Sequence, residues 1–353
     1  MNNTLTPTRL SIRQRWAAAG LAALLAGALP AFAAPPVKVV GYVPAFKADM
    51  PGIVDRVDLK QLTHLNIAFL NPDSEGNLVQ NGKPVCMGMA QASDLQAVVR
   101  KAHKTGVKVL VSLAGGVIPA CSGNWQDLLQ PASRPRLVKN LLGFVQQFKL
   151  DGIDVDLEGA LLTAIDKDGN YTPFVQALRQ GLKGQLLTAA TATYEGGMVP
   201  ASSLPSFDFV TLMAYDAIGP GWGKAGDEHA PYAMAQSHME VWKSRGLPKE
   251  KMVLGLPLYG YGFNGYDQNY DVSAIVAQFG AAAAQSDVVG TRCATCAYIS
   301  YNGIPTIRAK TRLALEEGAG VMVWELSQDA SGPNSLMAVI RAEINAIQSK
   351  KGL

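Results

Sequence analysis

Three carboxylates alternate along one short segment of the chain. Residues 149–159 read Lys-Leu-Asp-Gly-Ile-Asp-Val-Asp-Leu-Glu-Gly. If this segment is a strand, its two-residue period places Asp154, Asp156 and Glu158 on one face and the intervening apolar side chains on the other. Like charges at this spacing cannot all ionise, so we expect at least one carboxyl to stay protonated near neutral pH. A protonated carboxyl beside ionised ones can act as a general acid, which predicts an active site.

Two other interpretations of these acids were weighed against catalysis. A calcium-binding loop starting at Asp154 requires a glutamate at its twelfth position, which is Ile165. A buried salt-bridge cluster requires basic partners, and none lies between Lys149 and Lys167. Partners from other strands leave this second alternative open. Asp151 is out of phase with the other acids, so we expect it to have a structural role in a turn or cap.

Short apolar runs recur along the chain, each followed by turn residues and then by a stretch with apolar residues at helical spacing. Continuous apolar runs are typical of parallel strands buried on both faces. Alternating units of this kind predict an α/β fold, the (β/α)8 TIM barrel. An open doubly wound sheet is the alternative, but its G-x-G-x-x-G is missing after the first run. The predicted strands are Val37–Val43, Leu62–Phe69, Val107–Leu113, Gly152–Leu157, Leu186–Ala192, Phe207–Ala214, Met252–Pro257 and Gly320–Trp324.

The barrel prediction orders the acids by depth, because active sites of such barrels lie at the carboxyl ends of the strands. Glu158 is then nearest the mouth, and we expect it to donate a proton. Asp156 and Asp154 lie deeper and are expected to share one. The connection between strands seven and eight, residues 262–303, is the longest and is predicted to be a short insertion.

Two other predicted strands also end in residues suited to a binding site. The sixth ends in Tyr215 and Asp216, a hydroxyl donor and an acceptor, which is weak evidence alone. The eighth ends in Trp324, whose ring could floor a pocket and stack on a sugar. Packing in the core is an equally good interpretation of this tryptophan.

The first 33 residues differ from the rest of the chain. Three arginines precede an apolar run that ends in Ala31-x-Ala33, which predicts a secretory signal peptide and a secreted or periplasmic protein. A membrane anchor is the alternative, but the run is short for a span. Residues 34–353 are predicted to form one catalytic domain. Removing the leader takes three of the 31 basic residues and none of the 28 acidic ones, so no basic surface for nucleic acid is expected.

Four cysteines follow the leader, which in an exported protein predicts two disulfides. Three pairings are possible, and proximity favours Cys293 with Cys296, leaving Cys86 with Cys121. A redox or zinc pair at the Cys-x-x-Cys is the alternative, but no second cysteine pair or spaced histidine pair accompanies it.

With these motifs in place, the chain resembles the chitinase family, glycoside hydrolase family 18, from its first predicted strand to its last. The family's D-x-x-D-x-D-x-E signature is matched by residues 151–158 and its Met-x-Tyr-Asp motif by residues 213–216. Its second, seventh and eighth strands are similar to residues 63–69, 253–260 and 320–325.

The chain departs from the family pattern in two places. The third strand of the family commonly ends in Ser-x-Gly-Gly, whereas this chain has Leu113-Ala114-Gly115-Gly116 with Ser112 displaced by one residue. A role for Ser112 is therefore in doubt. The insertion is also short for the family's α+β insertion domain, which implies a shallower cleft.

The resemblance implies substrate-assisted retaining hydrolysis of β-1,4-linked N-acetylglucosamine, in chitin or chitooligosaccharides, with no cofactor and no metal. Glu158 would protonate the glycosidic oxygen, Asp156 would orient the substrate's acetamido group, and Asp154 would exchange a proton with Asp156. Tyr215 would donate a hydrogen bond to the acetamido oxygen. The substrate-binding residues that the resemblance implies are Trp324, Met213, Asp216, Tyr42 and Phe69.

Two other functions use the same barrel. An endo-β-N-acetylglucosaminidase would cut the core of N-glycans with the same catalytic logic, and loop shape decides between the two enzymes. A chitinase-like lectin would bind the sugar without cutting it, but such proteins typically lack the acid that Glu158 supplies. Aromatic residues make up only 7% of the chain, which favours soluble or amorphous substrate over crystalline chitin. We expect a monomer without a membrane partner once the leader is removed.

Overall fold

Eight parallel strands close into a barrel, which confirms the predicted TIM-barrel fold. The computed structural model describes residues 1–2, 36–194 and 196–350, so residues 3–33 of the predicted signal peptide lie outside the described residues. Around the barrel the strands follow the order β1-β14-β9-β8-β7-β6-β5-β2. These strands are β1 (Lys38–Pro44), β2 (His64–Leu70), β5 (Lys108–Ala114), β6 (Gly152–Asp156), β7 (Leu186–Thr191), β8 (Phe209–Leu212), β9 (Met252–Pro257) and β14 (Gly320–Trp324).

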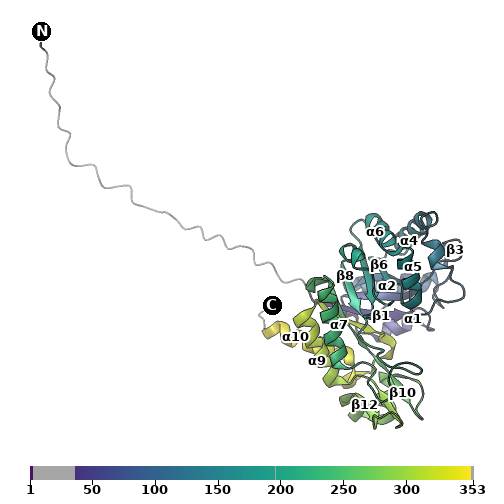
Figure 1. Ribbon diagram of the computed structural model, residues 1–353, viewed down its shortest axis with the longest axis vertical. Helices are drawn as coiled ribbons and strands as arrows, with labels where there is room; N and C mark the ends of the chain where they lie inside the picture. The colour runs from purple at the N-terminus through teal and green to yellow at the C-terminus, as the bar shows by residue number, and fades with distance from the viewer. Residues whose placement is uncertain (3–35, 195, 351–353) are drawn as a thin grey trace. The chain divides into compact units, whose positions relative to one another are not determined.

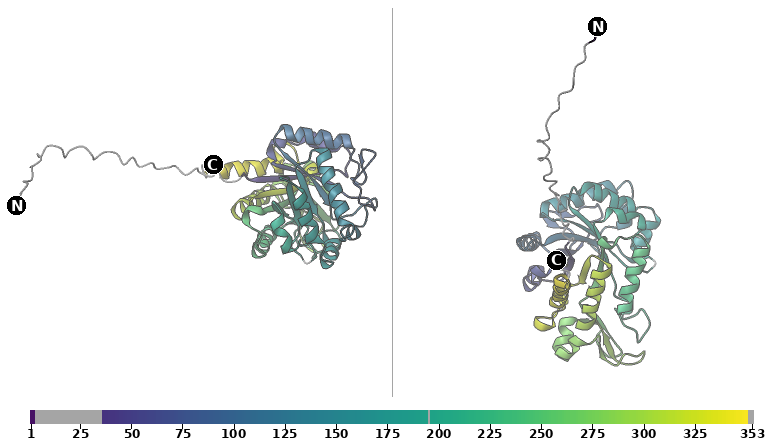
Figure 2. Two further views of the ribbon diagram at one scale, coloured as in Figure 1. Left: turned by 90° about the horizontal axis from the view of Figure 1, so that it is seen from above. Right: turned by 90° about the vertical axis from the view of Figure 1, so that its left-hand side faces the viewer.

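Helices between the strands cover the outer face of the barrel (Figures 1 and 2). Their apolar side chains pack against the outward side chains of the strands, such as Ile153 and Val155 of β6, which are fully buried. This two-sided burial is the physical reason for the continuous apolar runs in the sequence. The helices are α1 (Met50–Arg56), α2 (Ala92–Lys104), α3 (Trp125–Leu128), α4 (Arg134–Phe148), α5 (Gly159–Lys167), α6 (Tyr171–Gly181), α7 (Tyr232–Ser244), α9 (Ile304–Glu317) and α10 (Leu336–Lys350).

The segment between β9 and α9 folds into a small α+β subdomain, marked by β10 and β12 at the lower edge of the barrel in Figure 1. Its antiparallel sheet has the order β11-β10-β13-β12 and begins at Tyr259, ahead of the predicted start at 262. Helix α8 (Val272–Phe279) joins a separate apolar cluster with Tyr270, Ile299 and Tyr301. The strands are β10 (Tyr259–Phe263), β11 (Asn269–Asp271), β12 (Val288–Gly290) and β13 (Tyr298–Ser300).

Both favoured disulfide pairings are present. Cys86–Cys121 ties the connection after β2 to the connection after β5. Cys293–Cys296 closes a short loop between β12 and β13. In the part of the chain that the structure describes, no helix has the length and apolar character of a membrane span.

Candidate active site

Strand β6 turns its alternate carboxylates toward the inside of the barrel, and Asp154 is the deepest. Asp154 is fully buried and accepts hydrogen bonds from three hydroxyl groups. Tyr42 Oη and Ser112 Oγ donate to its Oδ2 at 2.7 and 2.8 Å, and Thr188 Oγ1 donates to its Oδ1 at 2.5 Å. Burial raises the pKa of Asp154, while these hydrogen bonds act in the opposite direction by stabilising the carboxylate.

Ser112 contacts Asp154, although the sequence left its role in doubt. Register places Ser112 of β5 beside Asp154 of β6. Ala114 has a φ of 70°, the left-handed conformation that glycine adopts most easily. Residues 112–115 therefore follow the Ser-x-Gly-Gly spacing with Ala114 in place of the first glycine.

Asp156 follows Asp154 by two residues toward the carboxyl end of β6, and it is 3% exposed. Burial raises its pKa well above the usual range, and the charges of Glu158 and Asp154 and a hydrogen bond with Glu158 add to the rise. No described residue pairs with its Oδ1. The raised pKa favours the protonated form of Asp156, which can donate to Glu158. The sharing of a proton between Asp154 and Asp156 stays a prediction.

Glu158 lies two residues beyond the end of β6, and it is the N-cap residue of α5. Burial raises the pKa of Glu158 to about 7, the hydrogen bond from Asp156 lowers it, and the charge of Asp216 raises it. A carboxyl with this pKa is partly protonated at neutral pH, which suits a general acid. The backbone of Gly116 lies beside this carboxyl, where a side chain would approach the Glu158 oxygens to 3.2 Å.

A cavity of about 500 Å³ opens above these acids. Trp324, at the end of β14, lines it, and the Trp324 ring lies 5.3 Å from the ring of Tyr42 and 5.5 Å from that of Phe69, centroid to centroid. The ring of Phe46 is stacked on that of Phe69, with 6.4 Å between the ring centroids. Flat aromatic rings beside carboxylates are the combination that a sugar with apolar C–H faces and polar edges requires.

Tyr215 and Asp216 form the wall next to Glu158. Burial raises the pKa of Tyr215 well above its usual range, so its hydroxyl stays protonated. Asp216 has a φ of 64°, and its Oδ1 accepts a hydrogen bond from Tyr259 Oη at 2.5 Å. His229 Nδ1 lies 3.5 Å from the same oxygen.

The structure brings all of the predicted site residues together. Asp154 lies beneath the cavity, and the lining contains the rest: Glu158, Asp156, Tyr215, Trp324, Met213, Asp216, Tyr42 and Phe69. Asp151 lies apart, at the opposite end of β6, where it accepts hydrogen bonds from Lys108 Nζ, His103 Nε2 and the backbone of Val109.

Several residues that contact Asp154 or line the cavity were not identified from the sequence. Thr188 is a polar residue inside an apolar strand, and Met322 shares the parity of Trp324, so both could have been found by the period of two. Phe46, Asn71 and Tyr259 also line the cavity. Phe46 and Asn71 lie just beyond the ends of β1 and β2, where no periodic signal exists.

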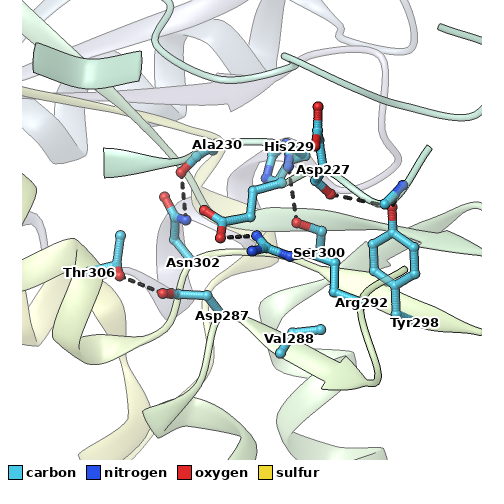
Figure 3. A network of polar contacts seen from close by, with 12 residues as sticks. Asp227, His229, Ala230, Asp287, Val288, Arg292, Tyr298, Ser300, Asn302 and Thr306 are labelled. Atoms are coloured by element: carbon cyan, nitrogen blue, oxygen red, sulfur yellow. Dashed lines mark hydrogen bonds and ion pairs between the residues drawn. The ribbon is translucent and has the colours of Figure 1, made fainter. Parts of the chain in front are cut away.

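The loop after β8, residues 217–231, rests on the α+β subdomain (Figure 3). The backbone of His229 donates to Ser300 Oγ at 3.0 Å, and Asn302 Nδ2 donates to the carbonyl of Ala230 at 2.8 Å. Arg292 forms an ion pair with Glu228. The subdomain therefore fixes the wall that starts at Asp216.

No cluster of metal-ligating side chains occurs among the described residues. The side chains brought together here include Glu158, whose raised pKa suits it to transfer a proton, and Tyr215, whose hydroxyl can donate a hydrogen bond.

Comparisons with known proteins agree with this geometry. The family model "Glycosyl hydrolases family 18" matches residues 38–329. A class V chitinase of Arabidopsis thaliana is 26% identical over 323 residues, 78% of this chain and 83% of the relative. A chitinase-like effector of Moniliophthora roreri is 26% identical over 240 residues, 60% of this chain, and the match spans only 55% of the effector's length.

Among solved structures, the family 18 chitinase from the chitin utilization locus of Flavobacterium johnsoniae superimposes with a TM-score of 0.76 at 35% identity. The superposition covers 89% of this chain and 96% of that chitinase.

Two substitutions should move the pKa of Glu158 in opposite directions. Asp156→Ala removes the hydrogen bond that stabilises the Glu158 carboxylate, so the pKa should rise above about 7. Asp216→Asn removes a neighbouring negative charge, so the pKa should fall. A titration of the side-chain carboxyl ¹³C shift, assigned by its disappearance in Glu158→Gln, measures both values. Shifts of the same sign in the two variants would contradict this account of the site.

Proposed function

The chain belongs to family 18 of the glycosyl hydrolases, and we propose that it hydrolyses β-1,4-linked N-acetylglucosamine in chitin or chitooligosaccharides with retention of configuration. The observation that carries the proposal is the carboxyl of Glu158, whose pKa is raised to about 7 and which lies beside Asp156, another carboxyl with a raised pKa. Both acids face a cavity floored by aromatic rings.

The first step cleaves the glycosidic bond. Glu158 gives its proton to the glycosidic oxygen, and the carbonyl oxygen of the substrate's own 2-acetamido group attacks C1. The product is a cyclic oxazolinium ion, so this route differs from hydrolysis by two protein carboxylates. Tyr215 donates a hydrogen bond to the acetamido oxygen and holds it in line for the attack.

Positive charge develops on the acetamido group during this step, and the buried carboxyls respond to it. Asp156 passes its proton to Asp154, whose three hydroxyl partners hold it at the base of the site. The ionised Asp156 then stabilises the acetamido nitrogen. In the second step, water attacks C1 and breaks the bond between C1 and the acetamido oxygen, which restores the acetamido group. Glu158, now a carboxylate, takes the water's proton.

A lectin function and an N-glycan substrate compete with this proposal. A pure sugar-binding protein has no need for a carboxyl whose pKa is raised to about 7. A fluorogenic chitobioside separates hydrolysis from binding, and a high-mannose glycoprotein separates the two enzyme activities.

Replacing the proposed acid should abolish turnover without abolishing binding. Glu158→Gln keeps the size of the side chain and removes the transferable proton, so kcat on chitotetraose should fall by about 10²–10⁴ or more. Calorimetry with the same sugar should still detect binding. Glu240→Gln, on the exposed side of α7, is the matched control and should keep wild-type turnover. Normal turnover by Glu158→Gln would exclude Glu158 as the acid.

The pH dependence of hydrolysis should report the protonation of Glu158. Because the acid must carry its proton, kcat/KM should fall about tenfold per pH unit above a midpoint near the pKa of about 7. An ordinary glutamate would place this midpoint near 4.5. Initial rates on a fluorogenic chitobioside between pH 4 and 10 locate it. A descending limb centred below pH 5 would contradict the assignment.

We further propose that the protein is exported as a monomer, with residues 1–33 removed as a signal peptide. The two disulfides are consistent with an oxidising compartment. N-terminal sequencing of the exported protein should begin at Ala34. Retention of the leader in the mature protein would favour the membrane-anchor alternative.

A further inference from the structure

An ion pair joins the connection after β1 to the connection after β14. Lys47 follows Phe46 between β1 and α1, and Glu325 follows Trp324 at the end of β14. Lys47 Nζ lies 2.6 Å from Glu325 Oε1. Phe46 and Trp324 line the cavity above the acids, whereas their charged neighbours do not. The pair therefore lies behind the cavity wall and has no part in the chemistry proposed above.

The two ends of this ion pair are also the two ends of a row of stacked rings, Phe46, Phe69 and Trp324, which we call the aromatic row. The Phe46 and Phe69 rings are within 13° of parallel, and the Phe69 and Trp324 rings are within 22°. Ring contacts connect Phe46 to Trp324 on the cavity side, and the ion pair connects them on the backbone side. The contacts thus form a closed circuit that fixes both ends of the row.

The Glu325 end of the circuit is rigid. Glu325 is 2% exposed and is the N-cap residue of the short helix η5 (Leu326–Gln328). The backbone N–H of Ser327 donates to Glu325 Oε2 at 2.8 Å, and Ser327 Oγ donates to Oε1 at 2.6 Å. Gln328 Nε2 donates to Asp271 Oδ1 of the α+β subdomain at 2.8 Å. Trp324 is therefore followed by a segment fixed to the rest of the protein.

The Phe46 end of the circuit lies in a loop. Residues 46–48 belong to neither a strand nor a helix, and Phe46 is 46% exposed. Lys47 Nζ reaches Glu325 and also donates to Ser327 Oγ at 2.8 Å. Among the described residues, Lys47 is the only basic side chain within ion-pair distance of Glu325. Exposed ion pairs contribute little, but a buried carboxylate that loses its one cation is costly, so this pair holds its geometry.

We propose that Lys47 and Glu325 are positioning residues, whose ion pair holds Phe46 in the aromatic row before the sugar binds. The inference rests on the proposed function, because it takes the ligand of the row to be an N-acetylglucosamine oligomer. Without the pair, the Phe46 loop has to be ordered when the sugar binds, which lowers affinity. The pair thus acts on sugar binding, and proton transfer by Glu158 does not depend on it.

Binding of chitotetraose to the Glu158→Gln protein tests this inference without hydrolysis. Adding Lys47→Met, which keeps the length of the side chain and removes its charge, should raise the Kd measured by calorimetry about tenfold. In the enzyme that keeps Glu158, Lys47→Met should raise KM while kcat stays within about twofold of the wild-type value. Lys101→Met is the matched control, because Lys101 pairs with Asp55 on the outer helices at the same 2.6 Å and has a similar exposed fraction, 39%. It should leave the Kd unchanged.

A double variant separates positioning from a general loss of stability. Lys47→Met leaves the buried Glu325 carboxylate unpaired and should lower Tm, whereas Lys47→Met/Glu325→Gln leaves no unpaired charge and should recover Tm. Binding should stay weak in the double variant, because the tether on Phe46 is still missing. The double variant carries the same expectation if Lys47→Met alone does not fold. Recovery of both Tm and affinity in the double variant would overturn the inference.

Removal of the Phe46 ring provides the second test. In a Phe46→Ala background, adding Lys47→Met should change the Kd by less than about twofold, since the pair acts through that ring. An equal loss of affinity with and without Phe46 would overturn the inference, as would an unchanged Kd in Lys47→Met. Absence of hydrolysis by the wild type with intact sugar binding would overturn the proposed function alone. Absence of chitotetraose binding by Glu158→Gln would overturn both.

Discussion

The site depends on keeping three carboxylates out of water without a cation beside them. Three hydroxyl groups donate hydrogen bonds to Asp154, and burial is the largest cause of the raised pKa values of Asp156 and Glu158. An arginine or lysine at this position would lower both pKa values and remove the proton that catalysis requires. The barrel supplies the alternative, because strand register brings Ser112 and Thr188 to the level of Asp154 from the two neighbouring strands.

The sequence was sufficient wherever periodicity controls the structure. The period of two along β6 placed the acids inward, because the other face packs against helices and must be apolar. The same reasoning predicted the barrel and the positions of Tyr215 and Trp324 at strand ends. Short separation in the chain was enough to favour the Cys293–Cys296 pair, since its partners lie in one loop.

The sequence was insufficient wherever the outcome depends on backbone conformation or on distances between side chains. The contact of Ser112 with Asp154 was not predicted, because the left-handed φ of Ala114 has no sequence signal unless the residue is glycine. The hydrogen bond that links Asp156 to Glu158 depends on the orientation of both side chains, which has no sequence signal. Lys47 and Glu325 form an ion pair although 278 positions separate them in the chain, which no local pattern records.

Loop 217–231 is anchored on the α+β subdomain, so two parts of the chain build the site. The acids belong to the barrel, whereas the ring of Trp222 follows a loop fastened to Ser300 and Asn302 of the subdomain side. Tyr259, the first residue of β10 in the subdomain, also donates to Asp216, whose charge raises the pKa of Glu158. A mutation that reshapes the subdomain can thus change the wall of the cleft and the strength of the acid together.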